Sequence, residues 1–104
     1  MVNSRDKGAR AERTLANKLK EYGYDTRRGQ QFCGLNGQAD VVGLPNIHIE
    51  CKRVEQGYTA INSAMAQSIR DSREGETPVV MHKQNRKPWL VTMTLEDWIK
   101  LYEG

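Results

Sequence analysis

The 104-residue sequence contains no long apolar run and only two cysteines. Its apolar stretches are far shorter than the roughly 20 residues that a membrane span requires, so no membrane contact is expected. The first ten residues, MVNSRDKGAR, lack the apolar segment of a secretory signal. Cys33 and Cys51 have no C-x-x-C spacing and cannot form a disulfide framework. These absences predict a cytoplasmic protein in which both cysteines act as small apolar side chains rather than zinc ligands.

The composition predicts one small globular domain that spans residues 1–104. Hydrophobic residues make up 38% of the chain, charged residues 28%, and the mean hydropathy is −0.75, which allows one modest core. No internal repeat, low-complexity tract or linker interrupts the sequence. The net charge of +3 permits a nucleic-acid partner but does not demonstrate one, because a solvated surface has similar basic clusters.

Hydrophobic periodicity and turn residues predict three helices and five strands. The helices are expected at residues 5–22, at 60–73 and after Thr94. The strands are expected within residues 24–29, in two segments of 39–54 that flank the turn GLPN, and within 77–82 and 89–93. Loops are expected at 29–38 and 55–59. The last helix carries an apolar stripe: Leu95, Trp98, Ile99 and Tyr102. The order α-β-β-β-α-β-β-α predicts a mixed α/β domain with one sheet covered by helices.

The stretch IHIECK (residues 47–52) carries charges that an apolar strand does not need. Side chains alternate across a strand, so one face is expected to carry the core residues Ile47, Ile49 and Cys51. The opposite face is expected to carry His48, Glu50 and Lys52. We expect a structural or phosphate-contacting role for His48 rather than a role as general base. On an isolated edge strand this polar face would be ordinary solvated surface.

Asp40 opens the preceding strand and suggests a purpose for the polar face. Antiparallel pairing around GLPN would bring Asp40 near Glu50 or Lys52. Two converging carboxylates repel each other unless a cation joins them. Hard oxygen ligands suit Mg²⁺ or Mn²⁺, which can polarise a phosphate and lower the pKa of a bound water. The pattern therefore favours phosphodiester hydrolysis.

Glu12 is a third candidate carboxylate, located on the first predicted helix. It lies in line with the core-facing residues Leu15 and Ala16, where an unpaired carboxylate would be costly. Two interpretations follow. The side chain reaches the rim of the domain or pairs with Arg13 or a lysine of the sheet, or the helix docks on the sheet and points Glu12 at the metal site.

A glutamate on the first helix, then an aspartate, about ten residues, and Glu-x-Lys together resemble the PD-(D/E)XK nuclease superfamily. The segments KGARAERTLANKLKEYGYDTRR, ADVVG and IHIECKR are similar to archaeal-type Holliday-junction resolvases and their phage-encoded relatives. The resemblance covers nearly the whole chain and is strongest from Lys7 to Arg53. It implies a restriction-endonuclease-like fold, with a single mixed sheet flanked by helices.

The resemblance also implies an activity and a set of site residues. The expected enzyme is a Mg²⁺-dependent (or Mn²⁺-dependent) endonuclease of a prokaryotic cell or phage-infected host that resolves four-way branched DNA by phosphodiester hydrolysis. Its metal ligands would be the side chains of Glu12, Asp40 and Glu50 and the backbone carbonyl of Cys51. Lys52 would be the catalytic lysine. Gln67 matches a polar residue often placed near such sites, or is a plain exposed helix residue. A homodimer is expected, with residues 89–93 and Trp98 as a source of the contact.

Two positions depart from the resolvase pattern. Ala39 stands where the motif's name has proline, and no serine lies between Ser4 and Ser63, where the resolvases tend to have a catalytic serine. Two alternatives therefore stay open: a nuclease of the same fold that cuts flaps or duplex DNA, and a non-catalytic DNA-binding accessory module. In each case the expected phosphate contacts are Lys7, Arg10, Arg13, Arg27, Arg28, Lys83, Arg86 and Lys87.

Overall fold

The structure is a computed structural model that describes residues 4–29, 38–54 and 58–104. Its helices are α1 (Ser4–Glu21), α2 (Thr59–Asp71) and α3 (Leu95–Glu103). Its strands are β1 (Arg27–Arg28), β2 (Val41–Val42), β3 (Ile47–Arg53), β4 (Thr77–Lys83) and β5 (Leu90–Thr92). The order predicted from the sequence is confirmed. Most of the two predicted loops, including Cys33, lies outside the described residues.

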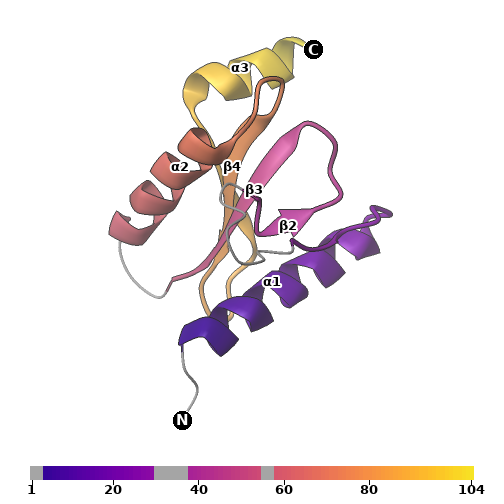
Figure 1. The fold of residues 1–104 in the computed structure, drawn as a ribbon, viewed down its shortest axis with the longest axis vertical. Helices are drawn as coiled ribbons and strands as arrows, with labels where there is room; N and C mark the ends of the chain where they lie inside the picture. The colour runs from indigo at the N-terminus through magenta and orange to yellow at the C-terminus, as the bar shows by residue number, and fades with distance from the viewer. Residues whose placement is uncertain (1–3, 30–37, 55–57) are drawn as a thin grey trace.

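The strands form one mixed sheet in the order β1-β2-β3-β4-β5 (Figure 1). β1, β2 and β3 pair antiparallel, β3 and β4 pair parallel, and β5 returns antiparallel to β4. α2 forms the crossover that a parallel pair requires. The restriction-endonuclease-like arrangement is therefore confirmed, with β3 at the centre of the sheet and β4 as an interior strand.

Different helices cover the two faces of the sheet, and Figure 1 shows α1 and α2 on opposite sides of it. On the α1 side, Leu15 and Ala16 belong to one core cluster with Ile49 and Met81. On the α2 side, the buried Ser68 hydroxyl donates to the carbonyl oxygen of His48 at 3.1 Å. Both faces of β3 are therefore packed, which explains why the strand is buried from residue 48 to residue 51.

The turn between β2 and β3 fixes how these two strands pair. Gly43 has a φ of 122° and Asn46 a φ of 68°, conformations that glycine and asparagine tolerate best. A side chain at Gly43 would also collide with the backbone of Asp25 and Thr26. The predicted turn around GLPN is thus confirmed, and it holds Val41 opposite Ile49.

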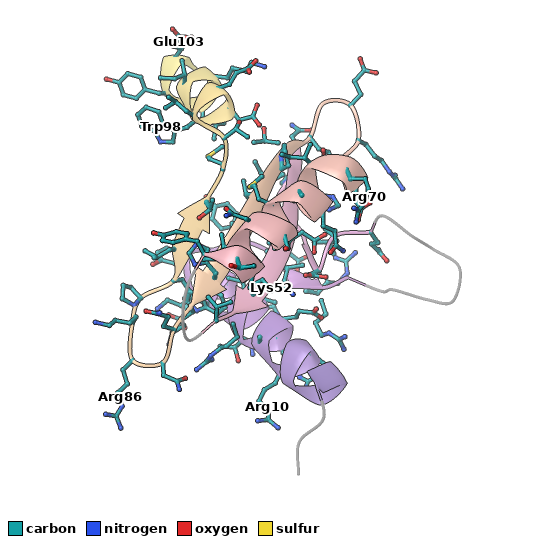
Figure 2. All side chains as sticks on the ribbon, turned by 90° about the vertical axis from the view of Figure 1, so that its left-hand side faces the viewer. Arg10, Lys52, Arg70, Arg86, Trp98 and Glu103 are labelled. Carbon is teal, nitrogen blue, oxygen red and sulfur yellow. The ribbon has the colours of Figure 1, made fainter. Side chains whose placement is uncertain are left out.

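α3 begins as predicted but does not pack into the core. The Thr94 hydroxyl accepts a hydrogen bond from the Asp97 amide at 3.1 Å, which caps the first turn. No residue of α3 is buried, and its apolar stripe faces solvent. Figure 2 shows α3, with Trp98, at one end of the molecule and away from the helix-covered sheet. None of the helices in the described part of the chain has the length and apolar character needed to cross a bilayer.

Candidate active site

Asp40 lies directly before β2, and its side chain is hydrogen-bonded to the side chain of Glu50 on the neighbouring strand β3. The Asp40 amide donates to the Ile49 carbonyl at 2.9 Å, which extends the β2–β3 ladder by one residue. The Asp40 side chain does not point freely into solvent, because its Oδ2 accepts a hydrogen bond from the Cys51 amide at 2.9 Å. Of the two partners predicted for Asp40, Glu50 and Lys52, the register selects Glu50.

Glu50 is the most strongly perturbed carboxylate of this group. Only 4% of its surface is exposed. Burial, together with a side-chain hydrogen bond to Asp40 and the negative charge of Asp40, raises the pKa of Glu50 to about 7. The imidazole of His48 opposes this shift, with Nε2 at 3.3 Å from Glu50 Oε1. Because the carboxylates of Asp40 and Glu50 are close together and Glu50 is buried, the state in which both are ionised is disfavoured.

Glu12 approaches the same corner from α1. Its side chain is 15% exposed, and its Oε1 accepts a hydrogen bond from Arg28 Nε at 2.9 Å. Burial raises the pKa of Glu12, with a further contribution from the negative charge of Asp40. Glu12 therefore pairs with a basic residue of the sheet, but the partner is Arg28 and not Arg13 or a lysine. The negative charge of Asp40 also acts on Glu12, and a role as metal ligand stays a prediction.

The charged side chains of this region all act on Cys51. Burial, together with the negative charges of Asp40, Glu12 and Glu50, raises the pKa of its thiol to about 12. Lys52 acts in the opposite direction on the same thiol. The thiol is therefore inert at neutral pH, as expected for a small apolar side chain. The three carboxylates and the lysine thus surround one short segment of β3.

Lys52 and Gln67 differ in how they relate to this cluster. Lys52 follows on β3, is exposed, and lies on the same face of the strand as Glu50. Gln67 is exposed on α2 and makes no hydrogen bond to a described residue, whereas the adjacent Ser68 is buried against the backbone of β3 and β4. The structure therefore places Lys52 beside the carboxylates and leaves Gln67 at the protein surface.

His48 also contacts a second carboxylate, that of Glu76, which the sequence analysis did not predict. The imidazole is 2% exposed, and its Nδ1 lies 3.6 Å from Glu76 Oε1, while Nε2 faces Glu50. The hydrogen bond with Glu50 raises the pKa of His48 despite its burial. Glu76 precedes β4, so only the parallel pairing of β3 with β4 brings it to His48. No motif in the sequence indicates this contact.

Most of the basic residues predicted to contact phosphate are exposed to solvent. Arg10, Arg13, Arg27, Arg86 and Lys87 are exposed, and Lys83 is half-buried. Arg28 is exposed but holds Glu12, and the side chain of Lys7 lies outside the described part of the structure. Figure 2 shows Arg10 and Arg86 projecting at the end of the molecule opposite α3. These two of the expected phosphate contacts thus lie on the side of the molecule away from its C-terminal helix.

The oxygen donors of this corner fit a small hard cation better than a soft metal. Among the described residues, no three His, Cys, Asp or Glu side chains form a ready-made metal cage. Mg²⁺ does not require one, since it is usually held by one or two carboxylates, waters and phosphate oxygens. Asp40 and Glu50 supply two carboxylates whose mutual repulsion a cation would relieve. The donor set is therefore compatible with the predicted cofactor.

The family comparison agrees with this geometry. A family model described as "Phage putative PDDEXK endonuclease" matches residues 3–104 of the chain. The match covers α1, the β2–β3 hairpin, α2 and the rest of the sheet. No curated protein matches the chain.

Proposed function

The chain belongs to this family of phage PDDEXK endonucleases, and from that premise we propose that it is a Mg²⁺- or Mn²⁺-dependent nuclease that cuts four-way branched DNA as a homodimer. The observation that carries the proposal is the pairing of Asp40 with Glu50 on adjacent strands, with the pKa of Glu50 raised to about 7. Such a buried pair of carboxylates destabilises the fold in the absence of a ligand, so it calls for a functional explanation.

The proposed metal ligands are the carboxylates of Asp40, Glu50 and Glu12 and the backbone carbonyl of Cys51. A bound Mg²⁺ or Mn²⁺ would polarise the scissile phosphate and lower the pKa of a water. The hydrogen bond from the Cys51 amide holds the Asp40 carboxylate in place at 2.9 Å, and Arg28 holds Glu12. Asp40 and Glu12 would thus be oriented before a metal binds, which reduces the ordering cost of binding.

Lys52 is proposed as the catalytic lysine. It is exposed beside the buried Glu50, so its ammonium can approach a phosphate and stabilise the negative charge that develops in the transition state. Gln67 is retained only as a candidate polar neighbour of the site, because it is exposed on α2 and has no hydrogen bond to a described residue. Its removal should therefore matter less than the removal of Lys52.

The DNA would lie across the exposed cations of α1, β1 and the β4–β5 turn, which are the expected phosphate contacts. Two incisions are needed to resolve a four-way junction, so a homodimer would supply one active site for each cut. Exposed apolar residues on β5 and α3 are consistent with self-association: Leu90 is 55% exposed, Val91 56% and Trp98 47%.

The decisive experiment compares cleavage of a labelled four-way junction, a flap and a linear duplex, with Mg²⁺, with Mn²⁺ and with EDTA. We expect metal-dependent cleavage of the junction. Asp40→Asn and Glu50→Gln should abolish cleavage while junction binding persists or tightens, since each removes negative charge near phosphate. Matched controls are Asp25→Asn and Glu74→Gln, which remove exposed carboxylates outside the cluster and should cut normally.

The same assay separates the proposal from its two alternatives. If linear duplex or flap DNA is cut as well as the junction, the junction preference is wrong and a nuclease of different specificity remains. If no substrate is cut with either metal while DNA binding is retained, the chain is a non-catalytic accessory module. Loss of binding with unchanged cleavage rate in the Asp40 and Glu50 variants would contradict the assigned roles.

A further inference from the structure

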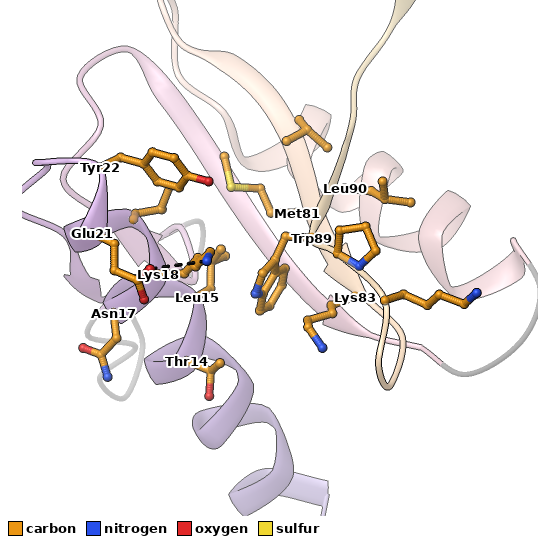
Figure 3. Close-up of a pocket in the computed structure, with 14 residues that line it drawn as sticks. Thr14, Leu15, Asn17, Lys18, Glu21, Tyr22, Met81, Lys83, Trp89 and Leu90 are labelled. Carbon is orange, nitrogen blue, oxygen red and sulfur yellow. Dashed lines mark hydrogen bonds and ion pairs between the residues drawn. The ribbon is translucent and has the colours of Figure 1, made fainter.

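A groove runs between α1 and the β4–β5 edge of the sheet, away from the carboxylate cluster. Its volume is about 820 Å³ (Figure 3). α1 packs on β1, β2 and β3, and it leaves the same side of β5 open at Val91, which pairs with Met81 and is 56% exposed. The apolar lining comes from Leu15 and Leu19 on α1 and from Met81, Trp89 and Val91 on the facing strands. Such an open apolar groove is the kind of surface that accepts an amphipathic helix.

The rim of the groove is basic. Lys18 projects from α1, while Lys83 and Lys87 project from the β4–β5 side. One acidic residue, Glu21, lies among them and is paired with Lys18 at 3.3 Å. Figure 3 shows Lys18 and Lys83 on opposite walls, so an occupant of the groove would lie between positive charges. The groove therefore favours an apolar helix with acidic flanks.

α3 is an amphipathic helix with an acidic polar side, and none of its residues is buried against the described part of its own chain. Its apolar residues fall at i, i+3, i+4 and i+7, the anchor spacing of a helix that binds in a groove: Leu95, Trp98, Ile99 and Tyr102. Leu95 and Tyr102 are 74% and 76% exposed, and Trp98 stacks on Tyr102 with ring centroids 5.2 Å apart. The polar side is predominantly acidic, with Glu96, Asp97 and Glu103 against the single Lys100.

We infer that α3 of a second copy of this chain lies in the groove, and that the two copies exchange their C-terminal helices reciprocally. The stripe matches the apolar lining, and the acidic side matches the lysine rim. Because the exchange is mutual, it closes as a two-fold dimer with two identical contacts. Of the expected contact segment 89–93, Trp89, Leu90 and Val91 thus contribute to the dimer as lining of the groove, and Trp98 contributes as an anchor within it.

The connection to α3 disfavours docking of the helix into the groove of its own chain. β5 ends at Thr92 and α3 begins at Leu95, so only Met93 and Thr94 join them. The groove follows the chain from Lys87 to Val91, and α3 begins at Leu95 beyond the end of β5, so the helix would have to fold back over β5 to enter the groove of its own chain. Figures 1 and 2 place α3 at the end of the molecule opposite the β4–β5 turn. A helix from a second copy avoids that reversal of the chain.

This inference rests on the homodimer of the proposed function, but its test measures assembly without DNA or metal. The full chain should sediment as a concentration-dependent dimer in analytical ultracentrifugation. Trp98→Ala should weaken the dimer by at least about tenfold, as expected for a central aromatic anchor. Tyr58→Ala, which removes a 73% exposed aromatic residue at the start of α2, is the matched control and should leave the dimer unchanged.

Charge reversal identifies the two surfaces that meet. A groove variant, Lys83→Glu with Lys87→Glu, and a helix variant, Glu96→Lys with Glu103→Lys, should each dimerise at least about tenfold more weakly, because like charges then meet. An equimolar mixture should recover wild-type affinity, since each acidic groove then receives a basic helix and each basic groove an acidic helix. Circular dichroism of each variant alone verifies that it is folded.

Three results would overturn the inference. The first is a wild-type chain that stays monomeric at the highest concentration reached. The second is a dimer that the Trp98 and helix variants weaken but the groove variant does not, which would indicate that α3 pairs with α3. The third is a mixture that fails to recover affinity. A monomer that still cuts branched DNA would refute the exchange and the dimer while leaving the nuclease chemistry intact. A dimer that cuts no DNA would leave the helix exchange intact and refute the nuclease chemistry.

Discussion

Glu50→Gln should make the metal-free protein more stable at alkaline pH, although it removes a residue of the proposed active site. Glu50 is buried beside Asp40, and burial together with Asp40 raises its pKa from 4.5 to about 7. The folded chain therefore disfavours the ionised carboxylate. Glutamine has nearly the same shape and carries no charge, so it avoids the cost of ionising a buried group and keeps an oxygen that can face His48.

The magnitude and the pH window follow from the same shift. A pKa that is higher in the folded chain than in the unfolded chain contributes stability that is fully present below pH 4.5 and lost as the pH rises through about 7. The shift corresponds to a loss on the order of 3 kcal/mol. The raised pKa of His48 changes stability in the same direction, and its largest cause is the hydrogen bond to Glu50, so the substitution also reduces this second effect. His82, whose pKa burial lowers, acts in the opposite direction but is common to both proteins.

Urea denaturation in EDTA at about pH 5 and about pH 8.5 measures the effect. The stability difference, variant minus wild type, should grow by about 2–3 kcal/mol between these pH values, since most of the titration lies between them. The variant Asp40→Asn is an independent test of the same pKa shift. It removes a neighbouring negative charge, lowers the pKa of Glu50, and should shift the pH dependence of stability to lower pH. Parallel pH profiles for wild type and Glu50→Gln would refute the assigned burial of charge.

Two further predictions concern other parts of the domain. Ser68→Ala should lower the free energy of unfolding by about 1–3 kcal/mol, because the 3.1 Å hydrogen bonds from its buried hydroxyl to the carbonyls of His48 and Val79 are lost. Urea denaturation measures this, and an unchanged midpoint would contradict the packing of α2 on the sheet. Arg13→Gln should reduce the salt dependence of DNA binding by about one unit of slope. Arg70→Gln, on the exposed face of α2, is the control, and equal slopes for both variants would exclude Arg13 as a phosphate contact.

Local rules were sufficient to predict the central part of the site. Alternation of side chains along residues 47–52 separated the apolar face of Ile49 from the polar face of Glu50, and both assignments are confirmed. The turn residues of GLPN then fixed an antiparallel pairing, which brought Asp40 to Glu50. These predictions succeeded because each depends on short-range geometry: the two-residue period of a strand or the conformation of a four-residue turn.

Contacts between distant segments were not predictable in the same way. The partner of Glu12 is Arg28, which the chain reaches only after α1 ends and β1 begins. Glu76 reaches His48 only through the parallel register of β3 and β4. The stripe on α3 was predicted correctly as an amphipathic pattern, but periodicity states that a face is apolar and not which surface covers it. That information lies in the tertiary arrangement.

The perturbed carboxylates also explain why metal binding and folding should be coupled in this protein. At a pH near 7, protons and a divalent cation would compete for the carboxylate of Glu50, because its pKa is about 7. The metal-free fold is least stable at a pH at which Glu50 is ionised. At the same pH its carboxylate oxygens would bind a cation best. Stabilisation by Mg²⁺ or Mn²⁺ should therefore increase from about pH 6 to about pH 8 and should be lost in Glu50→Gln. Stabilisation that is independent of pH, or that persists in this variant, would place the cation elsewhere.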